Sequence, residues 1–228
     1  MKRTYKDITY TLKQSKRKTL SIYIEADSSV SVLAPESKTI SDIEKVIENK
    51  RYWVYKELAE KEMLNAARIK RDFVNGQGFL YLGKSYRLSI VDTQDVPLKL
   101  LNGYFCLRQN DVETAEKSFI DFYRQKGMKK FAARMRYYQE MLGVRPAGVR
   151  VLDLKTRWAS CSEDKMLNFH WKTMMAPMKI IDYVVVHELV HLIYPNHTDA
   201  FWNEVDKILP DYTERKEWLK ENGVSLDI

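Results

Sequence analysis

Several features that would assign a protein to a class are scarce or absent in this chain of 228 residues. It has two cysteines, Cys106 and Cys161, which is too few for a disulfide framework or a zinc site built on cysteine. No apolar run follows the basic opening residues, so we expect no secretory signal. The longest apolar stretch, residues 180–193, is too short and too interrupted to cross a membrane. We therefore expect a cytoplasmic protein with no membrane partner.

Internal repeats and low-complexity segments are also absent, and 45% of the residues are hydrophobic. A chain of this length and composition can bury a substantial core. We expect an α+β fold in two parts. Residues 1–102 should form a β-rich region with one long helix, and residues 103–228 a second domain.

Histidine is rare as well, and its distribution is uneven. Of the four histidines, three fall within residues 187–197. His187 and His191 are four residues apart, so on a helix they lie on one face and can bind the same metal ion. His197 supplies a third ligand and leaves the fourth position of a tetrahedral zinc open, as a catalytic zinc requires. The sequence therefore predicts one Zn²⁺ per chain.

Glu188 follows the first of these histidines and lies about 100° round the helix from it. Its carboxylate is placed to activate a zinc-bound water as general base, rather than to bind the metal. The alternative is an accidental pattern on an ordinary helix. Against this, the flanking segments 180–186 and 192–193 are strongly apolar, and a buried cluster of two histidines and a glutamate is costly unless a metal satisfies it.

The remaining elements follow from alternating or helically spaced apolar residues. Strands are predicted over 5–12, 19–33 with a hairpin turn at 27–29, 79–91, 98–107 with a turn at Asn102-Gly103, 149–158 and 166–173. Helices are predicted from a capping box at Ser41 to about residue 70, with room for an interruption, over 112–142 with Gly143 as C-cap, after Pro177, and around Phe201 and Trp202.

Three segments carry a resemblance to a known family: TRWASCS at 156–162, DYVVVHELVH at 182–191 and NHTDAFW at 196–202. With residues 15–20 and 81–86, they resemble the YgjP-like family of predicted zinc-dependent hydrolases, which is similar to zincin metallopeptidases and has neighbours among the WLM and SprT-like proteins. The resemblance implies a zincin-like core, in which an HExxH helix accompanies a small antiparallel sheet, and metallopeptidase activity. Ala159 departs from the family's usual glycine, which matters only if that backbone needs a positive φ.

Substrate-binding residues are expected beside the metal. Arg157, Trp158 and Tyr194 are the candidates, and the resemblance to zincins implies that an exposed edge of strand 156–159 pairs with an extended peptide. Arg157, Tyr183 and Tyr194 are also candidate oxyanion stabilisers, with structural roles as the alternative for these three side chains. Glu204 and Asp199 are candidate partners of a ligand histidine, with solvated surface acids as the alternative, and His170 is a second-shell or surface candidate rather than a ligand.

The net charge of +7 is concentrated in residues 1–20 and 121–155. Lys126, Lys130 and Arg134 are four residues apart and should align on one helix face. A peptide or protein substrate is the first expectation. The basic stretches keep two alternatives open, a metal-dependent hydrolase of nucleoside triphosphates and a DNA-associated protein. The sequence leaves the oligomeric state open.

Overall fold

The computed structural model describes residues 1–25, 27–66, 71–154 and 157–228, together with all their side chains except those of 60–66. The chain forms two compact units, Met1–Arg68 and Ile69–Ile228. We expected the division after residue 102, but that position is in the turn between two paired strands of the second unit. The α+β class is confirmed, with small mixed sheets and six α-helices in the described chain.

The first unit is built on a four-stranded sheet of order β1-β2-β4-β3. Its strands are β1 (Lys2–Tyr5), β2 (Ile8–Ser15), β3 (Ser21–Ile24) and β4 (Val30–Pro35). β3 and β4 pair antiparallel across residues 25–29, so the hairpin predicted there is confirmed. β2 and β4 pair in parallel, which makes the sheet mixed.

Two consecutive helices, α1 (Ile40–Asn49) and α2 (Arg51–Ala66), follow the sheet, so the long helical segment expected here is interrupted. They are separated at Lys50, and the expected continuation to about residue 70 lies outside the described residues. The capping box begins at Thr39, whose hydroxyl accepts from the Asp42 backbone N–H, and not at Ser41. Both positions offer a hydroxyl three residues before an acid, and the earlier one starts the helix.

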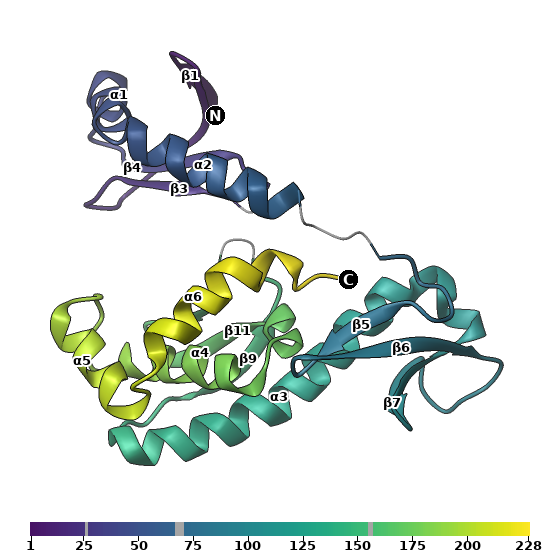
Figure 1. Cartoon of the computed structure of the whole chain (residues 1–228). Helices are drawn as coiled ribbons and strands as arrows, with labels where there is room; N and C mark the ends of the chain where they lie inside the picture. The colour runs from purple at the N-terminus through teal and green to yellow at the C-terminus, as the bar shows by residue number, and fades with distance from the viewer. Residues whose placement is uncertain (26, 67–70, 155–156) are drawn as a thin grey trace. The chain divides into compact units, whose positions relative to one another are not determined.

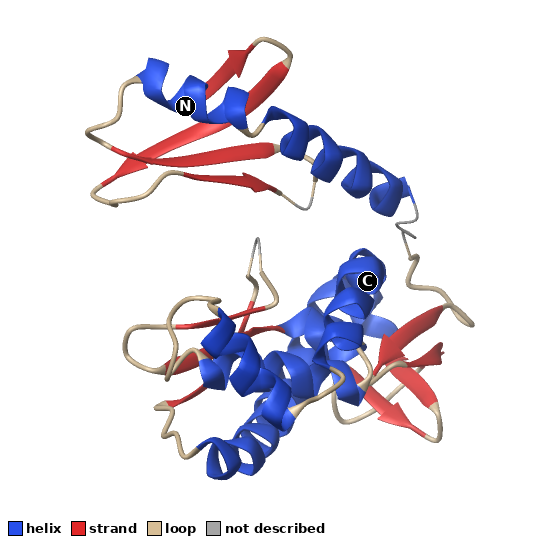
Figure 2. Cartoon of the chain, turned by 60° about the vertical axis from the view of Figure 1, so that its left-hand side comes forward, coloured by secondary structure: helices blue, strands red, loops and turns tan. Residues whose placement is uncertain are grey.

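The core of the first unit lies between sheet and helices. Val32, Ala34, Ile43, Ile47 and Val54 are fully or almost fully buried in it. Figure 2 shows the two helices following one another along the strands of this unit.

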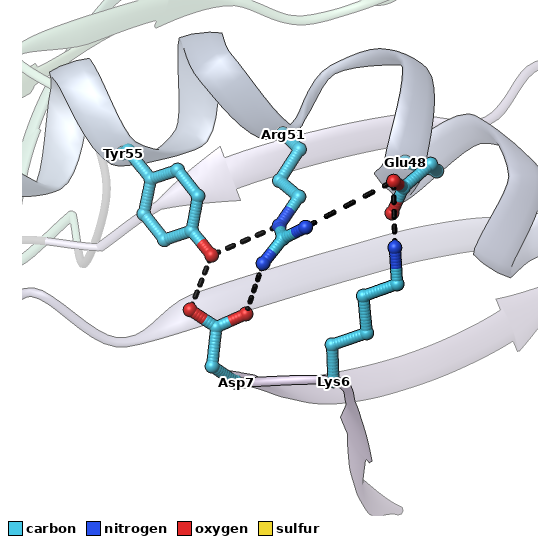
Figure 3. A network of polar contacts seen from close by, with 5 residues as sticks. All are labelled: Lys6, Asp7, Glu48, Arg51 and Tyr55. Atoms are coloured by element: carbon cyan, nitrogen blue, oxygen red, sulfur yellow. Dashed lines mark hydrogen bonds and ion pairs between the residues drawn. The ribbon is translucent and has the colours of Figure 1, made fainter.

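A polar network on the surface of the same unit ties the β1–β2 turn to the helices (Figure 3). Lys6 pairs with Glu48 at 2.7 Å, and Arg51 pairs with Asp7 at 2.8 Å. Tyr55 donates to Asp7 and accepts from Arg51. Because these groups are partly exposed, each pair contributes little stability alone, and the network chiefly fixes the position of the turn.

The second unit begins with a four-stranded sheet of order β5-β6-β8-β7. Its strands are β5 (Gly78–Tyr81), β6 (Lys84–Val91), β7 (Leu98–Leu101) and β8 (Tyr104–Arg108). The hairpin predicted at Asn102-Gly103 is confirmed, with both residues at positive φ as a tight turn of this type requires. A short 3₁₀ helix, η1 (Gln109–Thr114), leads out of the sheet.

The long helix α3 (Ala115–Leu142) runs past both sheets of the second unit (Figure 1). Gly143 adopts the left-handed conformation at its end, which confirms the predicted C-cap. Gly127 is buried where α3 meets Met174 and Val151, and a side chain there would lie 3.3 Å from both. The helix therefore packs closely against the layer that carries the candidate site.

That layer is a three-stranded sheet of order β10-β11-β9. It consists of β9 (Gly148–Leu152), β10 (Ala159–Cys161) and β11 (Met166–His170). The expectation of one strand over 149–158 in an antiparallel sheet is wrong, because β9 pairs in parallel with β11 and the chain must cross to the other edge before β10 begins. Part of that crossing, residues 155–156, lies outside the described residues. Ala159 has no positive φ, so alanine fits the strand.

The remaining elements follow this sheet. In chain order they are η2 (Trp171–Met175), α4 (Met178–Val190), α5 (Asp199–Ile208), α6 (Tyr212–Asn222) and η3 (Gly223–Ser225). Both α5 and α6 pack against α4. α4 is buried around most of its surface, as its apolar sequence predicts. None of the described helices combines the length and the apolar character needed to span a bilayer.

Candidate metal centre

The three histidines predicted as ligands are brought together. His187 lies in the last turn of α4, His191 is its C-cap residue, and His197 precedes α5. One ring nitrogen from each lies within 4.8 Å of the other two. The Nε2 atoms of His187 and His197 are 3.0 Å apart, close to the separation of about 3.3 Å that two nitrogens take on a tetrahedral zinc.

The orientation of His191 follows from a backbone contact. Its Nδ1 lies 3.1 Å from the carbonyl oxygen of Tyr194. A carbonyl oxygen only accepts hydrogen bonds, so Nδ1 carries the proton and Nε2 keeps its lone pair. This fixes the tautomer that a metal ligand needs. Tyr194, expected to bind substrate, thus contributes its backbone to the site.

All three imidazoles are held in the neutral form. Burial, with smaller contributions from nearby positive charges, lowers the pKa of His187 to about 3. Burial also lowers the pKa of His191 and of His197. Neutral imidazole is the form that binds metals, so these donors fit a divalent ion.

Glu188 lies on the same helix and is 5% exposed. Burial raises the pKa of its carboxyl to about 8, while the Arg157 charge and a hydrogen bond from the Cys161 backbone lower it. Its Oε2 is buried and has no hydrogen-bond partner among the described residues. A buried carboxylate oxygen without a partner is costly, and it marks a position where a further polar group fits.

Aromatic rings surround the histidines. Phe201 is fully buried, with its ring centroid 4.7 Å from those of His191 and His197. The ring of His197 stacks on Trp202, with centroids 5.5 Å apart, and Trp202 stacks in turn on Tyr212. These contacts orient the third histidine, which the short loop before α5 would otherwise leave free to rotate.

The other predicted residues are distributed differently. Arg157 is exposed, and its charge acts on Glu188. Trp158 packs against Gly223, where an added side chain would lie 2.7 Å from its ring. Glu204 is paired with Lys207 at 2.7 Å, and Asp199 is the exposed first residue of α5.

His170 is buried at the end of β11, away from solvent rather than on the surface. Its Nδ1 accepts from the Lys172 backbone N–H, and its Nε2 lies 3.4 Å from Asp153. Burial lowers the pKa of His170 to about 4. It is not part of the three-histidine cluster.

Comparison with known proteins places these residues in a family. The model of the YgjP-like metallopeptidase domain matches residues 18–222 of this chain. The chain belongs to the YgjP-like family. That membership, with the three-histidine cluster, supports a metal-dependent hydrolase.

Two further comparisons add less. No curated protein matches this YgjP-like chain. Among solved structures, the crystal structure of the metallopeptidase zymogen of Pyrococcus abyssi abylysin is similar, with 26% identity, covering 38% of this chain and 89% of that chain at a TM-score of 0.36. A likeness at that TM-score carries no weight for the fold.

Some contacts of this YgjP-like site were not anticipated from the sequence. They are the Cys161 backbone beside Glu188, the Trp202–Tyr212 stack behind His197, and Lys216, whose charge acts on two of the histidines. The sequence did indicate Phe201 and Trp202, as apolar residues of the last predicted helix. Nothing in the local pattern of α6 indicates that Lys216 lies near the histidines.

Proposed function

We propose that this protein is a zinc metallopeptidase whose metal ion is held by His187, His191 and His197. One observation carries the proposal: three neutral imidazoles converge beside a buried carboxyl group with an unpaired oxygen. Three imidazoles suit zinc better than magnesium or calcium, which prefer oxygen ligands. The family match supports peptides or proteins as the substrate class.

The chemistry divides between the metal and the chain. A zinc ion bound there would lower the pKa of a coordinated water to about 7 and polarise the carbonyl of the scissile bond. Glu188 accepts the proton of the attacking water and then delivers it to the leaving amine. The Cys161 backbone beside Glu188 favours the charged form of its carboxyl group, which is the form that accepts a proton.

Substrate binding is proposed along β10. This strand is at an edge of its sheet, so an extended peptide can pair with it, and it lies beside α4 as expected for a zincin-like core. Arg157 and Trp158 directly precede β10 and remain candidates for contacts with the bound peptide, as does Tyr194, whose carbonyl oxygen contacts His191.

No observation on the described residues favours the nucleotide hydrolase or the DNA-associated protein. Of the three cations spaced along α3, Arg134 is engaged by Asp182 through two hydrogen bonds, of 2.6 and 3.0 Å. The face expected to carry three free positive charges is therefore partly neutralised by the protein itself.

Elemental analysis of purified variants tests the ligand set. We expect about one zinc per chain in the wild type, and a strong loss in each of His187→Ala, His191→Ala and His197→Ala, because two imidazoles bind zinc much more weakly than three. His170→Gln is the matched control, since it removes the one histidine outside the cluster and should leave zinc content unchanged. Unchanged zinc in all three alanine variants, with the fold intact by circular dichroism, would show the ligand assignment to be wrong.

A further inference from the structure

Lys216, on α6, extends its ammonium group to the aromatic stack beside the metal centre. Its Nζ lies 4.5 Å from the centroid of the Trp202 ring. Trp202 in turn is stacked on His197, the third candidate ligand. A cation held over an aromatic face is attracted by the ring's quadrupole, so the charge is positioned beside the centre despite the exposure of the side chain.

Among the described residues, no carboxylate pairs with Lys216. In the parts of the chain that the structure describes, no acidic oxygen lies within 4.0 Å of Lys216 Nζ. The neighbouring Arg215 differs, because it pairs with Asp211 at 2.8 Å and donates to the Lys179 carbonyl oxygen. The positive charge of Lys216 is therefore available to a group from outside the chain.

The field of Lys216 reaches the centre. It contributes to lowering the pKa of His187 and of His197. Arg157 acts similarly on Glu188. Two cations thus act on different members of the site, and a bound substrate experiences positive potential from both.

We propose that Lys216 is a specificity-determining residue that binds an acidic side chain of a peptide substrate on the His197 side of the metal centre. The inference rests on the proposed peptidase function. A single ammonium is a compact point charge that suits one carboxylate. A nucleoside triphosphate spreads a larger negative charge over three phosphates, which one ammonium does not match. Among the described residues, Lys216 and Arg157 are the cations that act on the three histidines and Glu188.

The test compares peptides that differ only by Glu or Gln at one position, scanned along both sides of the scissile bond. The wild type should cleave the Glu peptide with the higher kcat/KM at one or two positions. Lys216→Met keeps most of the aliphatic stem over Trp202 but removes the charge, and should lower this Glu-to-Gln ratio by about 2-fold to 5-fold, the upper range for an exposed ion pair. Lys216→Glu should invert the preference.

The control is Lys129→Met, which removes one exposed positive charge from α3 in the same unit and should leave the ratio unchanged. If Lys216→Met and Lys129→Met both leave the ratio at its wild-type value, Lys216 only covers Trp202 and the proposal is wrong. The same conclusion follows if Lys216→Met lowers nucleoside triphosphate hydrolysis and leaves the Glu-to-Gln ratio unchanged.

Binding separates a failure of this inference from a failure of the peptidase function. Labelled Glu and Gln peptides are titrated by fluorescence anisotropy into Glu188→Gln, with and without Lys216→Met, at low and high salt. Tighter, salt-sensitive binding of the Glu peptide that disappears with Lys216→Met supports the role of Lys216 even if no peptide is cleaved. Equal affinities for the two peptides would contradict it even if peptides are cleaved.

Discussion

At the scale of single residues, burial sets the charge of the histidines in this protein. His170 shows the effect outside the metal centre, because its ring is 8% exposed and its pKa is lowered to about 4. The partly exposed Asp153 carboxylate opposes this shift and does not reverse it. The folded protein therefore keeps His170 neutral at pH values where an unfolded chain would protonate it.

This difference predicts a pH dependence of stability. Below the unfolded pKa of about 6.5 the unfolded chain binds a proton that the folded chain does not, so the free energy of unfolding falls as pH drops from about 6.5 to about 4. We expect this contribution to reach about 2 to 3 kcal/mol, and to be absent from His170→Gln. Urea unfolding of both proteins at pH 7.5 and pH 4.5 measures it. Equal losses of stability in the two proteins would contradict the assignment, since the other histidines titrate in both.

Among single residues, the convergence of the three histidines was the most predictable feature. Once a helix is assumed, the spacing of His187, His191 and His197 predicts that their rings converge, and it predicts Glu188 beside them on that helix. The contacts that fix these side chains were not predictable, because they come from backbone atoms and from distant elements. Tyr194 was considered for its side chain, whereas its carbonyl oxygen is what contacts His191.

At the scale of elements, the turn between β5 and β6 determines where α4 begins. The backbone N–H groups of Leu82 and Gly83 donate to the carbonyl oxygens of Met174 and Met175, each at 2.9 Å. Gly83 has φ of +78°, and a side chain there would lie 2.9 Å from the Cα of Pro177, the N-cap residue of α4. Glycine is needed here both for the backbone conformation and for the close approach.

Two glycine variants separate the effect of the backbone conformation from the effect of the close approach to Pro177. Gly103→Ala introduces an unfavourable positive φ in open space and should cost about 1 kcal/mol. Gly83→Ala adds a clash with the Pro177 backbone and should cost about 2 to 4 kcal/mol. Denaturant unfolding of both variants beside the wild type gives the two losses. Equal losses would mean that the contact with α4 contributes nothing.

Secondary-structure elements were predictable where neighbouring residues in the sequence specify them. The hairpin at Asn102-Gly103 and the C-cap at Gly143 follow from residues that favour positive φ. The break between β9 and β10 was missed because it depends on the parallel pairing of β9 with β11, which alternation along one strand does not reveal. Thr39 and Ser41 show that even a correct capping signal leaves the first residue of a helix uncertain by two positions.

At the scale of the whole molecule, the chain has two hydrophobic cores, one in each compact unit. The larger core surrounds the candidate metal centre. The expected division after residue 102 failed because β7 and β8, on either side of it, pair with each other in one sheet. Sequence patterns locate strands, but which strands share a sheet depends on long-range pairing that a single sequence does not specify.

The most direct test of the central claim is the rate of peptide hydrolysis by zinc-loaded wild type and zinc-loaded Glu188→Gln, compared at equal measured zinc content. Glutamine keeps the shape of the side chain and removes the base, so we predict that zinc stays bound while the rate falls about 10²-fold or more. An unchanged rate would remove Glu188 from the mechanism, and loss of zinc from the variant would mean that Glu188 holds the metal rather than moves the proton.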